Sequence, residues 1–422
     1  MAGGSREGGS GGGLGRMAAP ILSPADRIGE LLAQRDEANR AYFEVNAEAL
    51  ARLCHRMAER FARGGRLVAV GLSPGARSDV RHVTVEFVHP VIVGKRALPA
   101  IGLTRDGGPL RGQIELIGEP EDIVIAFGAA AEGGEQVRDS LTVARERGCL
   151  TVAFERGAGA EWELPPLGDD PSLRQELVET AYHLLWESVH VFFEHRGLLE
   201  GRRAGPVHDS GASSFLYPFL SEGESDLDSV IADVRASMLL KAEEVGELRE
   251  QTLGEGRGVL VAAAAELRKG FEAGGKVLAL GNGGSATDAM DLVADLRYPV
   301  DRSWRPRPAI DLTEDTAIIT AVGNDVGTEV IFQRQVIAYG RAGDALVALS
   351  TSGNSGNVIA ALTEARRRQM VSVAFVGYDG GRVAAEGLAD HVVVTRSQNI
   401  PRIQEAQASA YHALRELIEL AG

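Results

Sequence analysis

The stretch GGKVLALGNGGSATDAMDLVADL, from Gly274 to Leu296, decides the fold. It joins a short apolar strand to a helix through a glycine-rich turn. Glycines in such a turn let backbone N–H groups approach an anion at the helix N-terminus. An earlier stretch begins in the same way, since GGRLVAVG at 64–71 matches GGKVLALG at 274–281. The repeated unit indicates two related α/β domains in one chain.

Further segments repeat in the same order, at an offset of about 210–230 residues that exceeds any solenoid repeat. The pairs are EDIVIAFGAAAEGG (121–134) with GDALVALSTSGNSG (343–356), CLTVAFE (149–155) with VSVAFVG (371–377), and QELVETAYH (175–183) with QEAQASAYH (404–412). This pattern predicts the duplication of a whole domain.

Each copy opens with a long amphipathic helical stretch, at 25–62 and 226–273, followed by apolar strands that alternate with helices. Such alternation is typical of a parallel sheet covered on both faces. We therefore expect one α/β domain over 21–204 and a second over 226–422.

The remaining segments have the composition of connecting chain. Residues 1–20 are rich in Gly and Ser, which predicts a disordered tail without a signal-peptide core. Residues 205–225 are rich in Gly, Pro and Ser, which predicts a linker whose FLYPFL segment docks on one domain.

Composition narrows the class of protein. With 422 residues, 44% of them hydrophobic and 24% charged, the chain reads as a two-domain globular protein. A net charge of −15 argues against nucleic acid as the main ligand, and no apolar run reaches the roughly 18 residues of a membrane span. The two cysteines, Cys54 and Cys149, form no disulfide framework. We therefore expect a cytoplasmic protein without a membrane or nucleic-acid partner.

The second copy carries two loops suited to a phosphate. A helix N-terminus with four nearby hydroxyls can bind a phosphomonoester without Lys or Arg, and ligands of open α/β sheets sit at the carboxyl ends of strands. A simple helix cap would explain one or two of these hydroxyls. The candidate phosphate-binding residues are Asn282, Gly283, Ser285, Ser350, Thr351, Ser352 and Ser355.

Four segments, GNGGSATDAMDLVADL, GNDVGTEVIFQRQV, LSTSGNSGNVIAAL and RIQEAQASAYH, together resemble the SIS (sugar isomerase) family, and within it the phosphoheptose isomerases. The resemblance spans 226–422 and, more faintly, 25–205. It implies two tandem SIS domains, each a five-stranded parallel sheet flanked by helices in a flavodoxin-like three-layer sandwich. It also implies an oligomer with sites between subunits, a Ser/Thr loop that binds sugar phosphate, and zinc. The zinc and the proton transfers belong to a His-xxx-Glu pair and to a Gln and a His eight apart on the last helix.

The two copies depart from this pattern in complementary ways. The second has Asp291 and Asp295 in place of His and Glu, although Gln404 and His412 match; with Asp325, the two aspartates and Gln404 are secondary site candidates. An aspartate carboxylate is one methylene shorter than that of Glu, and a misplacement near 1 Å costs on the order of 100-fold in rate. We do not expect the second copy to act alone.

The first copy keeps the complete set that the family uses for metal and proton transfer: His82, Glu86, Gln175 and His183. It lacks the hydroxyl array, and Glu132 falls where a phosphate would sit and would repel it. Taken singly, His82 is better explained as a solvated helix histidine and His183 as a capped histidine of the core. Together they predict a metal centre in a domain that has lost its phosphate loop.

The sequence therefore predicts a composite site for aldose–ketose isomerisation of sedoheptulose 7-phosphate through an enediol. Glu86 would move the proton between C1 and C2, His183 or its counterpart His412 would act as acid at the carbonyl oxygen, and zinc would polarise the oxygens. A mixed set, in which Gln404 and His412 pair with His82 and Glu86, stays open. The expected assembly is a homodimer, pseudo-tetrameric in SIS domains, built through the long helices.

Two other classes of function stay open. SIS domains also serve as non-catalytic units that sense sugar phosphates or bind proteins, and phosphate-ester binding without turnover would indicate that role. Alternatively, the first domain is only an assembly surface, in which case its removal would leave full activity.

Overall fold

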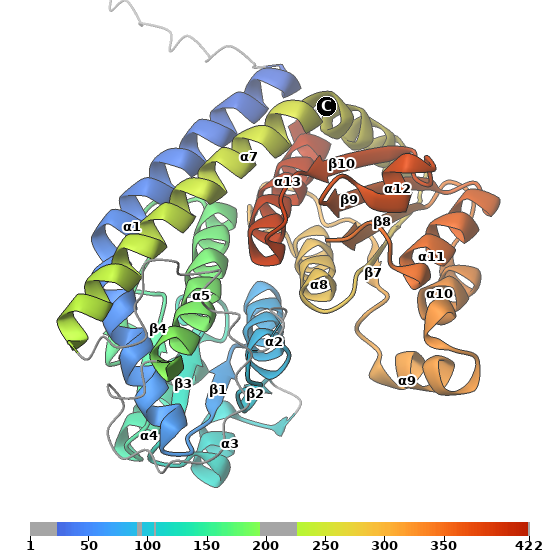
Figure 1. Ribbon diagram of the computed structural model, residues 1–422. Coiled ribbons are helices and arrows are strands. Elements are labelled where there is room, and N and C mark those ends of the chain that lie inside the picture. The colour runs from blue at the N-terminus through green and yellow to red at the C-terminus, as the bar shows by residue number, and fades with distance from the viewer. Residues whose placement is uncertain (1–22, 91–94, 105–106, 195–225, 421–422) are drawn as a thin grey trace, which may run out of the picture.

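The structure, a computed structural model, describes residues 23–90, 95–104, 107–194 and 226–420. Two α/β halves lie side by side and are bridged by a pair of long helices (Figure 1). The predicted tail and linker, with the FLYPFL segment, lie outside the described residues.

The N-terminal half is built on a five-stranded parallel sheet in the order β2-β1-β3-β4-β5. Its strands are short and its central ones are buried on both faces, as the apolar runs predict. The elements are α1 (Pro24–Ala62), β1 (Leu67–Val70), α2 (Pro74–Val88), β2 (Ala100–Leu103), α3 (Leu110–Ile117), β3 (Ile123–Ala126), α4 (Gly134–Glu146), β4 (Leu150–Ala153), β5 (Trp162–Glu163) and α5 (Pro171–Glu194).

The C-terminal half repeats this topology, with a five-stranded parallel sheet in the order β10-β9-β8-β6-β7. Read from the other edge, the order is that of the first half, which confirms the predicted fold of both domains. The elements are α7 (Leu227–Glu272), β6 (Val277–Leu280), α8 (Gly284–Arg297), β7 (Ala309–Asp311), α9 (Thr316–Asp325), η3 (Thr328–Val330), α10 (Ile331–Tyr339), β8 (Ala345–Ser350), α11 (Gly356–Arg367), β9 (Val371–Gly377), α12 (Gly381–Ala385), β10 (His391–Thr395) and α13 (Ile400–Leu420).

The long helices α1 and α7, of 39 and 46 residues, run antiparallel along each other (Figure 1). Asn39 Nδ2 donates to the carbonyl of Ala242 at 2.8 Å, which fixes their register. Each helix also enters the core of the other half: Leu31 of α1 is buried in the C-terminal core, and Val234 of α7 in the N-terminal core. The halves are therefore interlocked and cannot separate without exposing apolar surface.

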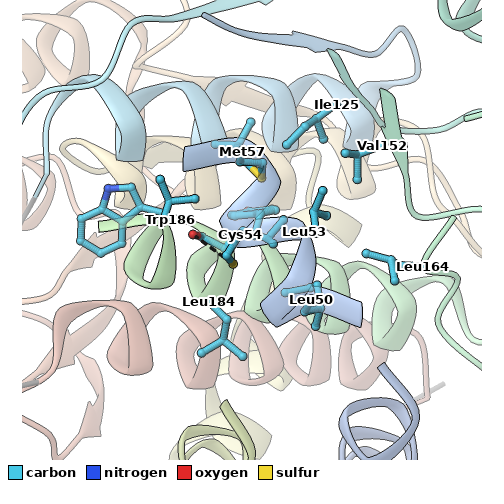
Figure 2. Close-up of a cluster of buried hydrophobic side chains, with 14 of the residues drawn as sticks. Leu50, Leu53, Cys54, Met57, Ile125, Val152, Leu164, Leu184 and Trp186 are labelled. Atoms are coloured by element: carbon cyan, nitrogen blue, oxygen red, sulfur yellow. Dashed lines mark hydrogen bonds between the residues drawn. The ribbon is translucent and has the colours of Figure 1, made fainter. Parts of the chain in front are cut away.

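The N-terminal core lies between the end of α1, the sheet and α5 (Figure 2). Leu53 and Met57 of α1 meet Ile125 and Val152 of the sheet, with Leu184 of α5 in the same cluster. All five side chains are fully buried. This packing fixes α5, which carries part of the site described below.

Both cysteines, Cys54 and Cys149, are buried and free, as expected. Among the helices of the described ranges, none is apolar over a stretch long enough to cross a bilayer.

Candidate active site

Four helices meet where the two halves touch: α2 and α5 of the N-terminal half, and α8 and α13 of the C-terminal half (Figure 1). α2 and α8 each follow the first strand of their half, so the predicted strand-turn-helix units face each other. α5 and α13 carry the repeated Gln and His residues. The interface between the halves therefore holds nearly all residues that the sequence predicts for metal binding and proton transfer.

Two residues of the N-terminal half and one of the C-terminal half converge on the Nε2 atom of His82. His82 Nε2 lies 3.3 Å from His183 Nε2, 3.9 Å from Glu86 Oε1 and 3.4 Å from Gln404 Nε2. All four side chains are buried. We call His82, Glu86, His183 and Gln404 the composite centre, because neither half contains it alone.

Gly284, the first residue of α8, brings the glycine-rich turn against the composite centre. A Cβ atom placed on Gly284 would lie 1.9 Å from Gln404 Nε2 and 2.8 Å from His82 Nε2. Glycine is required here by the close approach of the neighbouring side chains. The turn of the C-terminal half and the imidazole of the N-terminal half are thus in direct contact.

The predicted phosphate-binding residues lie in two adjacent loops at the carboxyl ends of the paired strands β6 and β8. Asn282 and Asn357 exchange side-chain hydrogen bonds of 3.0 and 2.9 Å, which tie the first loop to α11. In the second loop the Ser350 and Ser355 hydroxyls lie 3.4 Å apart, and the Gly353 N–H donates to Ser350 Oγ. The other predicted residues of these loops are Gly283, Ser285, Thr351 and Ser352.

A carboxylate of the C-terminal half orients His183, and a second one lies near His82 beyond hydrogen-bond distance. His183 Nδ1 donates to Glu405 Oε1 at 2.8 Å, and His82 Nδ1 lies 3.8 Å from Asp288 Oδ1. These contacts leave the two Nε2 atoms facing each other. Imidazole nitrogens and carboxylate oxygens are ordinary zinc ligands, and a carboxylate behind the imidazole is the usual support for such a ligand. The donor set therefore fits a zinc ion.

Burial sets the protonation of the composite centre. It raises the pKa of Glu86 to about 7, against a counteracting effect of His183. Burial and the neighbouring His183 lower the pKa of His82 well below its ordinary value. A neutral imidazole is the form that binds a metal ion.

Gln175 is not the glutamine that meets His82. Its Nε2 donates to Asp79 Oδ1 at 3.2 Å and to Glu179 Oε2 at 3.4 Å. The predicted set of His82, Glu86, Gln175 and His183 therefore comes together only in part, and Gln404 takes the place next to His82. Residues eight apart span about 12 Å along a helix, so the Gln and the His of one helix reach different places.

His412, the repeat of His183, is held in a different way. Its Nδ1 donates to Glu176 Oε1 at 2.9 Å and its Nε2 to Asp291 Oδ2 at 3.1 Å. Burial lowers the pKa of His412, but the hydrogen bonds to Asp291 and Glu176 outweigh it and raise the pKa to about 10. Both ring nitrogens of His412 thus face carboxylates other than Glu86, whereas Gln404, the other residue of the mixed set, does contact His82.

A cavity of about 460 Å³ lies beside the residues of the C-terminal half that repeat those of the composite centre. We call it the counterpart cavity; Asp295 and His412 line it together with loops of the N-terminal half. Where the C-terminal half has hydroxyls, this side has carboxylates: the Gly128 N–H donates to Glu155 Oε1 at 2.8 Å, and Glu132 accepts the hydroxyl of Tyr298. Carboxylates at these positions oppose phosphate binding.

The two remaining aspartates lie apart from the composite centre. Asp295 Oδ1 accepts the Val300 N–H at 3.0 Å and its Oδ2 lies 3.9 Å from Arg415 Nε. Asp325 is exposed at the end of α9, where Asn324 donates to it.

Three buried carboxylates were missed in the sequence: Glu179, Asp288 and Glu405. Glu179 lies four residues after Gln175 and four before His183, on the same helix face, which was an available signal. Asp288 and Glu405 act on residues of the other half, and no spacing within one half reveals such a contact.

Comparison with known proteins identifies the family of the two domains. The SIS domain family model matches residues 242–377. The phosphoheptose isomerase of Pelodictyon phaeoclathratiforme is 42% identical over 202 residues, which are 47% of this chain and 93% of that protein. That of Citrifermentans bemidjiense is 38% identical over 192 residues, 45% of this chain and 96% of that protein. Both matches cover about one half of the chain, the length of one domain.

Solved structures match the whole tandem arrangement. The C-terminal domain of the glucosamine-fructose-6-phosphate aminotransferase of Francisella tularensis covers 93% of this chain and 94% of its own, with a TM-score of 0.56 and 9% identity. The tagatose-6-phosphate ketose/aldose isomerase of Escherichia coli covers 96% of both chains, with a TM-score of 0.52 and 12% identity. At these identities the likeness concerns the fold. The chain belongs to the SIS family of phosphosugar isomerases, as two tandem SIS domains of which the C-terminal one is related to phosphoheptose isomerases.

Proposed function

We propose that this protein interconverts an aldose and a ketose phosphate, with sedoheptulose 7-phosphate as substrate, in a site shared by its two domains. The contact of Gly284 with His82 and Gln404 carries this proposal. It supports the proposal because the glycine-rich turn predicted to bind phosphate belongs to one domain and the His82 imidazole to the other. The substrate class follows from the relationship of the C-terminal domain to phosphoheptose isomerases.

The C-terminal domain would hold the substrate by its phosphate. The hydroxyls of Ser350 and Ser355, 3.4 Å apart, stand at the start of α11, whose first N–H groups point outward and favour an anion. Hydrogen bonds to a charged phosphate contribute about 1.5–3 kcal/mol each. With the phosphate fixed there, the other end of the sugar is free to extend along the glycine-rich turn toward His82.

Zinc would be held by His82 and His183, with an amide oxygen from Gln404. The Oε1 atom of Gln404 is buried without a hydrogen-bond partner, and a half-turn of its amide exchanges Oε1 with the Nε2 that now faces His82. When bound, zinc supplies Lewis-acid polarisation of substrate oxygens.

Glu86 would carry the proton transfer between carbon atoms. Its Oε2 is buried and has no hydrogen-bond partner, so it is available to a substrate proton. In the direction from ketose to aldose, Glu86 takes a proton from C1, an enediol forms, and the proton returns to C2 while the O1 hydroxyl proton passes to O2. His183 is better placed as a ligand than as the acid predicted from the sequence, because one Nε2 cannot donate a proton and bind an ion together.

Turnover of sedoheptulose 7-phosphate, with zinc measured in the same sample, tests the proposal. We expect Glu86→Gln to lower kcat by about 10²–10⁴-fold, the usual contribution of a general base. His183→Ala should abolish turnover and lower the zinc content while sugar-phosphate binding persists. His412→Ala is the matched control from the other half and should retain turnover.

The opposite result, with His412 essential and His183 dispensable, would place the chemistry in the C-terminal domain. Binding of the sugar phosphate without turnover, in the presence of zinc and with shorter ketose phosphates as well, would instead support a sensor. The double variant of His183 and His412 separates the cases, because residues of one centre lose activity non-additively.

A further inference from the structure

We infer that Glu179 is the carboxylate ligand of the zinc site proposed above, beside His82 and His183, and that Glu86 is thereby left free of the metal. The inference deepens the proposed function and rests on it for the reaction, but metal binding can be measured without any turnover. One ligand atom from each of the three residues lies within 4.8 Å of the other two. Ligands of a tetrahedral zinc ion are about 3.5 Å apart, so small side-chain rotations would close the site.

The contacts of Glu179 leave one oxygen available. Gln175 Nε2 donates to Oε2 of Glu179 at 3.4 Å, whereas Oε1 is buried without a hydrogen-bond partner. The side chain is fully buried. A buried carboxylate oxygen without a donor is costly, and a bound cation would offset that cost. Gln175 thus supports the ligand from behind instead of binding the metal itself.

The imidazoles of His183 and His82 each direct their Nε2 atom toward the proposed metal position. His183 uses Nδ1 for Glu405, at 2.8 Å, and keeps Nε2 free of a carboxylate. His82 has Nδ1 on the side of Asp288, at 3.8 Å, and its Nε2 faces that of His183. Glu179 and His183 are therefore each held by a second polar side chain, the arrangement found around protein-bound zinc.

The duplicated half offers an internal control. Ala408 stands where Glu179 does, and Asp291 stands where His82 does. The half that keeps both histidines thus also has the extra carboxylate, and the half without the second imidazole has a methyl group there. A carboxylate that served only to pack α5 would not need this association.

Glu86 lies at the edge of the trio. Its Oε1 is 3.9 Å from His82 Nε2, but it does not join the group of mutually close ligand atoms. With Glu179 as ligand, the metal has its carboxylate and Glu86 keeps both oxygens for the substrate. The prediction from the sequence had assigned both metal binding and proton transfer to Glu86.

Zinc titration of the full-length chain, stripped of metal with a chelator, tests the assignment. Glu179→Gln keeps the shape of the side chain and removes its charge, and we expect it to weaken zinc binding by at least about 100-fold, more than the loss of a supporting residue costs. Gln175→Ala should weaken it by about 10-fold. Glu86→Gln is the matched carboxylate control and should bind zinc as the unaltered chain does. Cobalt(II) absorption spectra give a second readout, since the Glu179 variant should lose the spectrum of a tetrahedral site.

Thermal unfolding without metal establishes that the Glu179 variant is folded, and it should be about as stable as the unaltered chain because Gln has nearly the same shape as Glu and carries no charge. Unchanged zinc affinity in Glu179→Gln, or a loss confined to Glu86→Gln, would overturn the assignment. If the chain is an isomerase and its Glu179 variant binds zinc normally, only this inference is wrong. If the chain has no isomerase activity but the Glu179 variant loses zinc, only the proposed function is wrong.

Discussion

Histidines at repeated positions have different hydrogen-bond partners in the two halves. His183 donates to the single carboxylate of Glu405, and its other nitrogen faces His82. His412 lies between the carboxylates of Glu176 and Asp291, and the pKa of His412 is raised to about 10. At the scale of a residue, identity of sequence therefore does not give identity of role.

The charge of His412 predicts a dependence of stability on pH. Its pKa rises from an ordinary 6.5 to about 10 on folding, so its stabilising contribution is complete below pH 6.5 and is lost as the pH rises toward 10. We expect the free energy of unfolding, measured with urea, to fall more steeply between pH 7 and 10 in the unaltered chain than in His412→Gln. Other groups titrate in both proteins and cancel in the difference. Parallel curves would contradict the raised pKa.

Hydroxyls of the second loop should determine the affinity for sugar phosphates. Replacing Ser352 and Ser355 together by Ala removes two donors, and at about 1.5–3 kcal/mol each the affinity should fall at least about 100-fold. Calorimetric titration with sedoheptulose 7-phosphate measures this. Ser303→Ala, in an exposed turn where the hydroxyl bonds Asp301, is the control and should bind normally. Equal affinities in the two proteins would exclude this loop as the phosphate site.

At the scale of elements, α2 packs against α8, so that the glycine-rich turn at the start of α8 lies beside His82 of α2. This contact depends on a bare backbone at Gly284, because any Cβ there would clash with Gln404 and His82. The N-terminal turn of α8 and the side chains of α2 and α13 consequently form one packed unit. A substitution in the turn should therefore alter the packing of both domains.

Gly284→Ala should therefore impair the composite centre. Its Cβ would lie 1.9 Å from Gln404 Nε2, and overpacking of this kind costs about 1–3 kcal/mol of stability. We expect kcat/KM to fall together with zinc affinity. Gly258→Ala, in the middle of α7 with no atom near the added Cβ, is the control and should be neutral or stabilised by up to about 1 kcal/mol. A Gly284 variant that behaves like the control would show that the turn and the imidazoles are not coupled.

The elements themselves were readable from the sequence. Strand, turn and helix at 274–296 repeat those at 64–86, and this repetition predicted both five-stranded parallel sheets. The apolar strands and the long amphipathic helices are local patterns, and local patterns survive folding well. The predicted long helices at 25–62 and 226–273 agree with α1 and α7 to within a residue.

The site was readable only in part. Helical spacing placed His82 beside Glu86, and order along the chain identified His183. The partner of His82, Gln404, comes from the other domain, and the packing angle between domains decides which glutamine reaches it. Glu179 was passed over because the family pattern assigned its place to no function.

At the scale of the whole molecule, the antiparallel helices α1 and α7 make the two domains one folding unit. Leu31 and Val234 are each buried in the core of the opposite half. The outer side of the helix pair remains apolar in places, since Val45 is 72% and Leu240 51% exposed. An exposed apolar area of this kind on the longest helices is suited to a second copy of the chain.

We accordingly expect a dimer of chains through the long helices, seen by sedimentation at micromolar concentration. The double variant Val45→Glu, Leu240→Glu should shift it to monomer, because charges would be buried in the contact. Leu116→Glu is the control: Leu116 is 85% exposed on α3, away from the long helices, and its change should leave the dimer intact. A monomeric unaltered chain would contradict the expectation.

The counterpart cavity has a consequence for stoichiometry. Two identical subunits related by a twofold axis carry every substitution in both of their shared sites. In this chain the twofold axis between the two domains is only approximate. Glu132 and Glu155 could therefore arise beside the counterpart cavity while Ser350 and Ser355 remained in the loops of the C-terminal half. A 422-residue chain should therefore saturate at one equivalent of sugar phosphate and one of zinc, although it has the two domains from which a symmetric pair would form two sites.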